Sequence, residues 1–158
     1  MDYHVGDKVI HSIYGLGEVV RIEEKIINGR PTNCYVVSVN ELTIWIPIND
    51  SHQNSLRTPT MPGEFEELFT ILTSPGETLP EDRLLRKDLL VEQLKNGQLS
   101  SICQVVRDLT HWKRTKKLND QEKSILERAI NSLLTEWIYS LGVSRHQAQQ
   151  GLAKMLEG

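Results

Sequence analysis

Apolar and polar positions alternate with a period of two over the first third of the chain, which is the pattern of half-buried β-strands. In the run EVVRIEEKII, one side of the predicted strand carries Val20, Ile22 and Ile26, and the other carries Val19, Arg21, Glu23 and Lys25. In the run TIWIPI, one side carries Ile44, Ile46 and Ile48, and the other carries Thr43, Trp45 and Pro47. We expect the isoleucine-bearing side of each strand to face a core.

Turn signals separate these apolar runs. Asn28 and Gly29 follow the first strand, and both residue types tolerate positive φ, so the pair is a strong hairpin signal. Asn40 and Glu41 separate the next two runs. Four or five short strands in so few residues predict a small, strongly bent sheet or barrel.

After the segment PTMPGE the apolar period becomes helical. A short helix is predicted over residues 65–72 and a longer one over residues 80–97, with a proline in its first turn and Gly97 at its end. Thr78 and Glu81 could form a capping box for the longer helix. The next helix presents one apolar face, formed by Leu99, Ile102, Val105, Val106 and Leu109.

Two more helices are predicted from their capping residues. Asn119 with Glu122 begins a long helix that ends at Gly142. One face of that helix carries Leu126, Ile130, Leu133, Leu134, Trp137, Ile138 and Leu141. Ser144 with Gln147 begins a last short helix.

The change of period predicts an α+β protein in two modules. Residues 1–60 form the β module, residues 61–80 form a short helix and linker with the joint at Thr73–Pro80, and residues 81–158 form an all-helical domain.

Two glycines near the start of the chain, in the segment HSIYGLGEVV, raise the question of a phosphate-binding loop. Such a loop needs a helix N-terminus behind the glycines, and here a strand-patterned run follows Gly15 and Gly17. We interpret the segment as a bend between two strands.

Composition and charge are those of a globular protein: 158 residues, 39% hydrophobic, 25% charged, and a net charge of −3. No apolar run is long enough to span a bilayer and the first residues lack a signal-peptide layout, so we expect a cytoplasmic protein. We also expect it to be a monomer. The net charge argues against nonspecific coating of nucleic acid but allows a local basic patch. Cys34 and Cys103 show no metal-type spacing, and we expect two buried, inert thiols.

No motif indicates an enzyme, a cofactor or a small-molecule substrate. The five histidines show no ligand spacing, so no metal is expected; they are His4, His11, His52, His111 and His146. No serine or cysteine lies in an elbow motif.

Trp45 is the clearest binding feature of the β module. It lies opposite the isoleucine side of its strand, while Arg21 and Lys25 lie opposite the apolar side of theirs. An exposed tryptophan beside long cationic side chains is typical of a protein-binding hot spot. The alternative is that Trp45 packs beneath the helical module or against a neighbouring loop.

Two basic segments mark the helical module. The run HWKRTKKL contains four cations and no acid, namely Lys113, Arg114, Lys116 and Lys117, which could neutralise phosphates or simply favour a helix C-terminus. The run EDRLLRKDLL carries Arg83, Arg86 and Lys87. We expect its leucines Leu84, Leu85 and Leu89 to be core residues.

Motifs from both modules occur together in one order along the chain. The β module contains VGDKVIHSIYGLGEVVRIEEKIINGR and YVVSVNELTIWIPIND, and the helical module contains VEQLKNGQLSSICQVVRDL and KKLNDQEKSILERAINSLLTEWIYSLGVS. In this order and spacing they resemble the CarD/CdnL family of bacterial transcription regulators, nearly from end to end.

The resemblance implies a Tudor-like or SH3-like barrel, of the kind found in transcription-repair coupling factors, that binds the RNA polymerase β subunit. The helical module would contact promoter DNA at the upstream edge of the bubble and stabilise the open complex. The alternative is a polymerase-binding adaptor without DNA contact. A more distant one is a Tudor-like peptide-binding module with an unrelated helical partner.

The resemblance also implies site residues. Family polymerase contacts fall on Lys25, which keeps the charge, and on Trp45, which does not; Arg21 completes the expected polymerase-binding set. A family tryptophan that wedges into the minor groove falls on Arg83, so the indole is missing. Arg86 and Lys123 match family basic positions that face DNA. The expected DNA-binding residues are Arg83, Arg86, Lys87, Lys113, Arg114, Lys117 and Lys123.

Overall fold

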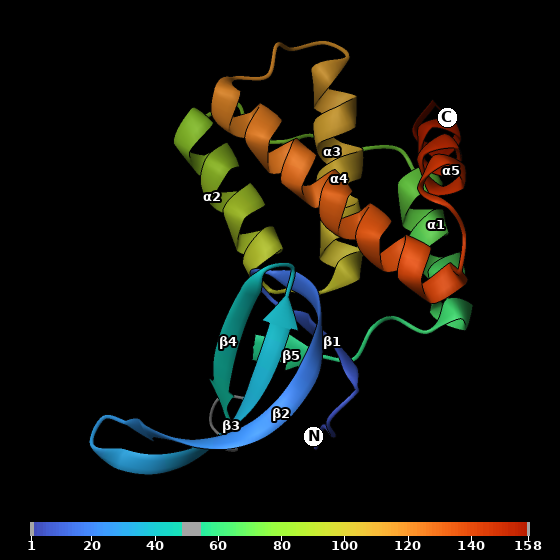
Figure 1. The fold of residues 1–158 in the computed structure, drawn as a ribbon. Coiled ribbons are helices and arrows are strands. Elements are labelled where there is room, and N and C mark those ends of the chain that lie inside the picture. Colours follow the sequence, from blue (N-terminus) through green and yellow to red (C-terminus); the bar gives the residue numbers. More distant parts are fainter. Residues whose placement is uncertain (1, 49–54, 158) are drawn as a thin grey trace. The chain divides into compact units, whose positions relative to one another are not determined.

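The chain folds as an antiparallel sheet followed by a set of helices (Figure 1). The computed structural model describes residues 2–48 and 55–157. It divides into two compact units between Pro59 and Thr60. The prediction of an α+β protein in two modules is therefore confirmed.

The units divide one residue from the predicted end of the β module at residue 60, and the segment Thr73–Pro80 lies within the second unit. Helix α1 (Phe65–Thr73) belongs to the second unit, because Phe65, Leu68 and Leu72 are buried in the core of that unit. The proline- and glycine-bearing segment after α1 is thus an internal loop of the helical unit.

The described part of the first unit contains five strands. They are β1 (Lys8–His11), β2 (Gly15–Ile27), β3 (Arg30–Val39), β4 (Leu42–Pro47) and β5 (Leu56–Arg57), in the sheet order β4-β3-β2-β1-β5. Asn28 and Gly29 make the β2–β3 turn with φ of 53° and 76°, and Asn40 makes the β3–β4 turn with φ of 56°. The small antiparallel sheet is as expected, while its Tudor-like classification stays a prediction.

Strand β2 departs from simple alternation at a β-bulge. Val19 pairs with Val37 and Arg21 pairs with Val36, so that Val20 is an extra residue between them. Val19 is therefore fully buried and Val20 is 37% exposed, the reverse of the prediction.

Beyond the bulge, Ile22 and Ile26 do alternate with Arg21 and Lys25, but they are 50% and 69% exposed. Ile26 pairs with Pro31 in the part of the long β2–β3 hairpin that extends past the last β3–β4 pair, Cys34 with Pro47; this extension is seen at the lower left in Figure 1.

The core of the β unit lies on the side of β4 predicted from its isoleucines. Ile46 is buried, and Ile44 and Ile48 pack against the same cluster. From Cys34 to Val37, strand β3 is buried on both faces, and Cys34 and Val36 have no exposed surface. Burial raises the pKa of the Cys34 thiol, as expected for an inert cysteine.

Gly15 and Gly17 have separate backbone roles. Gly15 has a φ of +87°, a conformation that L side chains rarely adopt. A Cβ on Gly17 would come within 2.5 Å of the Val39 side chain and 2.7 Å of the Ser38 carbonyl oxygen. The segment is thus a tight bend with a close strand contact, as interpreted from the sequence.

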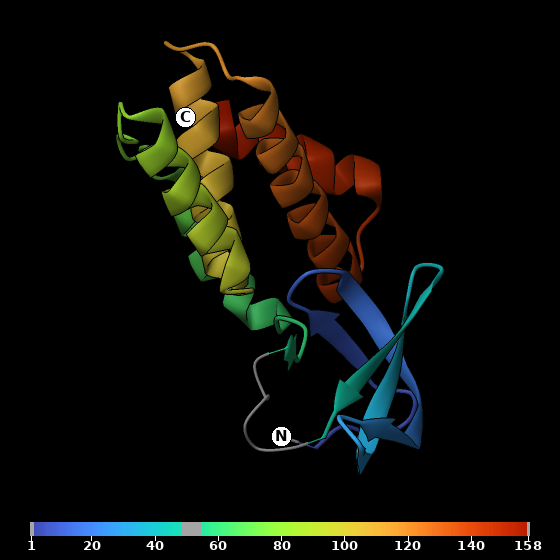
Figure 2. The same cartoon turned by 90° about the vertical axis from the view of Figure 1, so that its left-hand side faces the viewer.

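The second unit is helical. Its helices are α1, α2 (Arg83–Lys95), α3 (Leu99–Lys113), α4 (Asp120–Leu141) and α5 (Arg145–Glu157), preceded by a 3-10 turn at Pro62–Glu64. Helix α3 packs against α1, α2 and α4, and α5 packs against α1 and α4. Figure 2 shows α2, α3 and α4 side by side. Within the described ranges, no helix is both long and apolar enough to cross a bilayer.

Two of the three predicted capping boxes form. Asn119 and Glu122 cap the N-terminus of α4, and Ser144 and Gln147 exchange hydrogen bonds before α5. The box predicted for α2 from Thr78 and Glu81 is wrong, because Asp82 caps that helix and accepts hydrogen bonds from the backbone N–H groups of Leu84 and Leu85.

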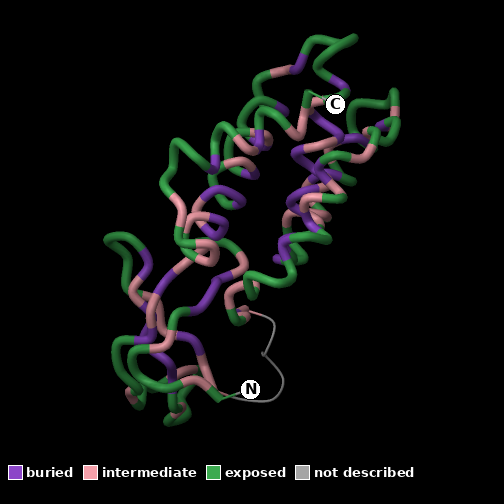
Figure 3. The backbone as a smooth tube through the Cα atoms, turned by 90° about the vertical axis from the view of Figure 1, so that its right-hand side faces the viewer, coloured by how far each residue is buried: buried purple, intermediate pink, exposed green. Residues whose placement is uncertain are grey.

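The apolar faces of α3 and α4 form the core of the helical unit, seen as buried segments in Figure 3. The five residues predicted for α3 are all buried. Leu84, Leu85 and Leu89 of α2 are not core residues, since they are 68%, 61% and 40% exposed. Helix α2 instead buries Leu90 and Arg86.

Candidate functional site

A cluster of charged and aromatic side chains lies on the outer face of the sheet, opposite the core. Arg21, Glu23 and Lys25 project from that face of β2 at every second position. Trp45 reaches the same face from β4, because Val36 pairs with Arg21 on one side and with Trp45 on the other. We call Arg21, Glu23, Lys25 and Trp45 the outer cluster.

The side chains of the outer cluster contact one another in the order Lys25, Trp45, Glu23, Arg21. The Lys25 ammonium lies 4.1 Å from the centroid of the Trp45 ring. The indole Nε1–H of Trp45 donates to Glu23 Oε1 over 3.4 Å, and Arg21 Nε donates to Glu23 Oε2 over 2.7 Å. The hydrogen bonds from Arg21 and then from Trp45 lower the pKa of Glu23. The structure therefore brings together the three residues predicted from the sequence.

Glu23 is the member of the outer cluster that the sequence reasoning missed. It has the same strand phase as Arg21 and Lys25, and that phase is the signal that could have found it. Its carboxylate joins the cations of β2 to the indole of β4 and so fixes the orientation of Trp45. Trp45 is half-buried, and its contacts with Lys25 and Glu23 come from another strand of the same sheet.

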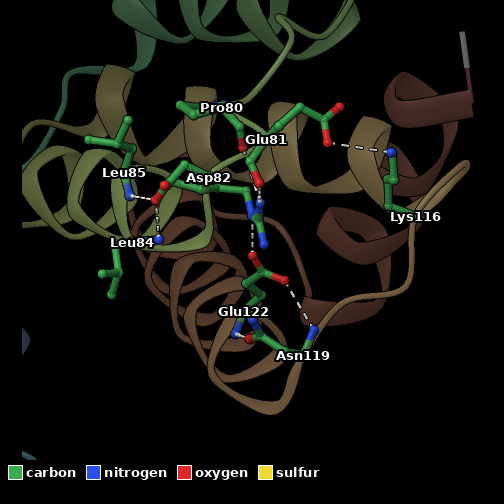
Figure 4. A network of polar contacts seen from close by, with 9 residues as sticks. Pro80, Glu81, Asp82, Leu84, Leu85, Lys116, Asn119 and Glu122 are labelled. Carbon is green, nitrogen blue, oxygen red and sulfur yellow. Dashed lines mark hydrogen bonds and ion pairs between the residues drawn. The ribbon is translucent and has the colours of Figure 1, made fainter.

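Most of the predicted DNA-binding residues gather at one end of the helical unit. This end is formed by the start of α2, the end of α3, the α3–α4 loop and the start of α4 (Figure 4). Lys116 of the loop pairs with Glu81 before α2 at 3.6 Å. Five of the predicted DNA-binding residues, Arg83, Lys87, Lys113, Lys117 and Lys123, are exposed or half-exposed here, and we call these five the cationic end.

Arg86 does not lie on the exposed surface, where it was expected to face DNA. It is 8% exposed and forms a buried ion pair with Glu122 of α4. Its Nε donates to Glu122, and its Nη1 donates to the carbonyl oxygens of Pro80 and Glu81 at 3.1 Å each. The guanidinium lies 4.8 Å from the ring centroid of Trp112. Arg86 therefore links the start of α2 to the start of α4, and no DNA contact is assigned to it.

Arg114 also has an internal contact, although it is exposed. Its guanidinium donates to the backbone carbonyl of Leu156 near the end of α5. This bond directs Arg114 toward α5, in contrast to Lys113 and Lys117, which line a hollow together with Lys123.

Two apolar side chains adjoin Arg83 at the start of α2. Leu84 and Leu85 are more than half exposed, and their backbone N–H groups are fixed by the Asp82 cap. The helix start thus presents leucines on a well-ordered backbone, as the stick view in Figure 4 shows.

The described residues contain no group of three or more His, Cys, Asp or Glu side chains that could hold a metal ion. Of the five histidines, His52 lies outside the described residues. Cys103 is buried, and burial raises the pKa of its thiol to about 12.

Comparison with protein families matches both units. Residues 3–59 match the CarD-like/TRCF RID domain, and residues 67–153 match the CarD C-terminal domain. The chain belongs to the CarD-like family. The family places this CarD-like chain among transcription regulators.

The alignment with one relative extends over both units of this chain. The Bacillus subtilis (strain 168) protein with the printed name "Putative transcription factor YdeB" is 28% identical over 151 residues, which cover 92% of this chain and 96% of the relative. The CarD-like chain therefore corresponds to the relative across both units.

Proposed function

We propose that the CarD-like chain regulates transcription initiation without chemistry of its own. The β unit binds the β subunit of bacterial RNA polymerase through the outer cluster, and the cationic end of the helical unit contacts promoter DNA beside the upstream edge of the bubble. Holding that edge stabilises the open promoter complex. The protein acts as a monomer in the cytoplasm and associates with the nucleoid by binding RNA polymerase.

The observation that carries the proposal is the outer cluster on a domain that matches the CarD-like/TRCF RID model. Trp45 offers a large, oriented aromatic surface, and Arg21 and Lys25 supply charge around it. Tryptophan and arginine are enriched at the hot spots of protein interfaces. A partner with carboxylates around an apolar pocket would complement this surface.

DNA contact is supported by the cationic end. Arg83, Lys113 and Lys123 come from three helices, and lysine or arginine side chains on the duplex release counterions when they neutralise phosphates. Leu84 and Leu85 replace the missing wedge tryptophan in our proposal, since leucine is among the apolar side chains that enter a base step from the minor groove.

Binding to polymerase makes strong DNA affinity unnecessary. A protein held at the promoter by one unit presents its other unit at high effective concentration. A chain with a net charge of −3 can therefore contact DNA through a local set of cations.

The experiment that tests the DNA part measures the lifetime of the open complex after addition of a competitor. The variant Lys113→Glu/Lys117→Glu/Lys123→Glu should shorten this lifetime and reduce the salt slope by about one unit for each phosphate that is no longer neutralised. Lys95→Glu/Lys154→Glu changes exposed cations away from the cationic end and serves as the control.

An unchanged lifetime in the triple variant, with polymerase binding retained, would favour the second candidate function. In that case the chain acts as a polymerase-binding adaptor through protein contacts alone. The burial of Arg86 is the observation that favours this candidate, because one expected DNA contact is used inside the fold.

A further inference from the structure

A pocket of about 600 Å³ opens between the end of α3, α4 and the start of α5. Its volume is within the usual range for sites that hold one small molecule, roughly 300–1,000 Å³. All of its walls belong to the helical unit.

The floor of the pocket is aliphatic. It is formed by Leu118 of the α3–α4 loop and by Leu126, Ile130 and Leu134 of α4. From Leu126 to Leu134 the floor follows two turns of α4, which is about 12 Å at 1.5 Å per residue. An extended aliphatic chain of medium length can lie along such a floor.

The rim of the pocket is cationic. It carries Lys113, Lys116, Lys117, Lys123 and Arg145, against one carboxylate, Glu127. In the part of the chain that the structure describes, only Lys116 of these five has an ion-pair partner. The rim therefore provides positive charge that internal carboxylates do not neutralise.

We propose that this pocket binds a single-chain aliphatic anion, with the chain along the α4 floor and a phosphate or carboxylate headgroup at the lysine and arginine rim. A free inorganic anion is not the best ligand, because it would leave the apolar floor exposed to water. A neutral lipid is disfavoured because its headgroup would leave the rim cations without a negative partner. A volume of about 600 Å³ favours a small molecule over a helix 10–12 Å in diameter.

Calorimetric titration of the full chain tests the proposal, with decyl phosphate and decanoate kept below their micelle-forming concentrations. At least one of them should bind saturably at one site. Inorganic phosphate and decanol should each bind at least about tenfold more weakly. Inorganic phosphate lacks the aliphatic chain, and decanol lacks the negative charge. The two anionic probes distinguish a phosphate from a carboxylate headgroup.

Variants locate the binding. Lys117→Glu/Arg145→Glu reverses two exposed rim cations, and Gln149→Trp fills the pocket from an exposed wall position. Each should weaken binding by roughly tenfold or more, and Lys154→Glu, on α5 but outside the pocket, should not. Thermal unfolding checks that each variant remains folded.

The proposal is overturned if neither anion binds, if the pocket variants bind as well as the natural chain, or if inorganic phosphate or decanol binds as tightly as the anionic amphiphiles. Capture of an acidic amphipathic peptide with the same variant sensitivity, in place of the two anions, would also overturn it. The titration contains neither DNA nor polymerase, so its outcome is independent of the proposed function.

Discussion

At the scale of single residues, His11 links a turn of the β unit to pH. The imidazole is 8% exposed, and its Nδ1 accepts hydrogen bonds from the backbone N–H groups of Ile13 at 3.0 Å and Tyr14 at 3.2 Å. Burial lowers the pKa of His11. Only the neutral ring can accept these bonds, so the folded state favours the unprotonated histidine.

The sign of the pH effect follows from that preference. Below a pH of about 6.5 the unfolded chain binds a proton at His11 more readily than the folded chain, so the unfolding free energy falls as the pH is lowered through this range. His11→Asn keeps a side-chain acceptor at this turn and removes the titration. The acid loss of stability should be smaller in this variant.

Urea unfolding at neutral and acidic pH, followed by the amide signals of the β unit, measures this difference. An equal loss of stability in the natural chain and in His11→Asn would show that other groups cause the acid sensitivity.

Residue-scale features divide into those visible in the sequence and those that tertiary contacts create. The phase of Arg21, Lys25 and Trp45 was predictable, because alternation within a strand is local. The burial of Arg86 was not, because it depends on a carboxylate that lies on another helix.

At the scale of elements, the ion pair of Arg86 and Glu122 joins α2 to α4. Their side chains are 9% and 4% exposed, and Glu122 Oε1 also accepts a hydrogen bond from the backbone N–H of Asn119 at 3.0 Å. The same carboxylate thus caps α4 and neutralises a buried guanidinium. Removing one partner of such a pair leaves a buried charge uncompensated.

Glu122→Gln should therefore lower the unfolding free energy of the helical unit by about 3–5 kcal/mol. Glu127→Gln, an exposed change on the same helix, should have an effect within about 0.5 kcal/mol. Chemical denaturation followed by Trp112 and Trp137 fluorescence measures both variants. A loss for Glu122→Gln no larger than that for Glu127→Gln would contradict the role of the pair.

Elements were predictable where their signals are local. The capping box at Asn119 and the hairpin turn at Asn28 are fixed by neighbouring residues and were found in the sequence. The bulge at Val20 and the outward leucines of α2 depend on which partners pack nearby. Periodicity alone counts Leu84 and Leu85 as apolar and cannot tell that both side chains are more than half exposed.

At the scale of the whole molecule, two units carry two different kinds of surface. The β unit presents an oriented tryptophan among charges, and the helical unit presents a cationic end beside exposed leucines. The β module was predicted to end at residue 60, beside the division between Pro59 and Thr60, while the segment after Thr73, which has the composition of a linker, is part of the helical unit.

Affinity of purified bacterial RNA polymerase for the full chain tests the central claim, that the outer cluster is the docking surface. Trp45→Ala/Lys25→Glu should weaken binding by roughly thirtyfold or more, the loss expected for a hot-spot residue worth about 2 kcal/mol. Glu24→Ala, on the opposite face of the same strand, should bind like the natural chain. Full affinity in a folded Trp45→Ala/Lys25→Glu variant would contradict the claim.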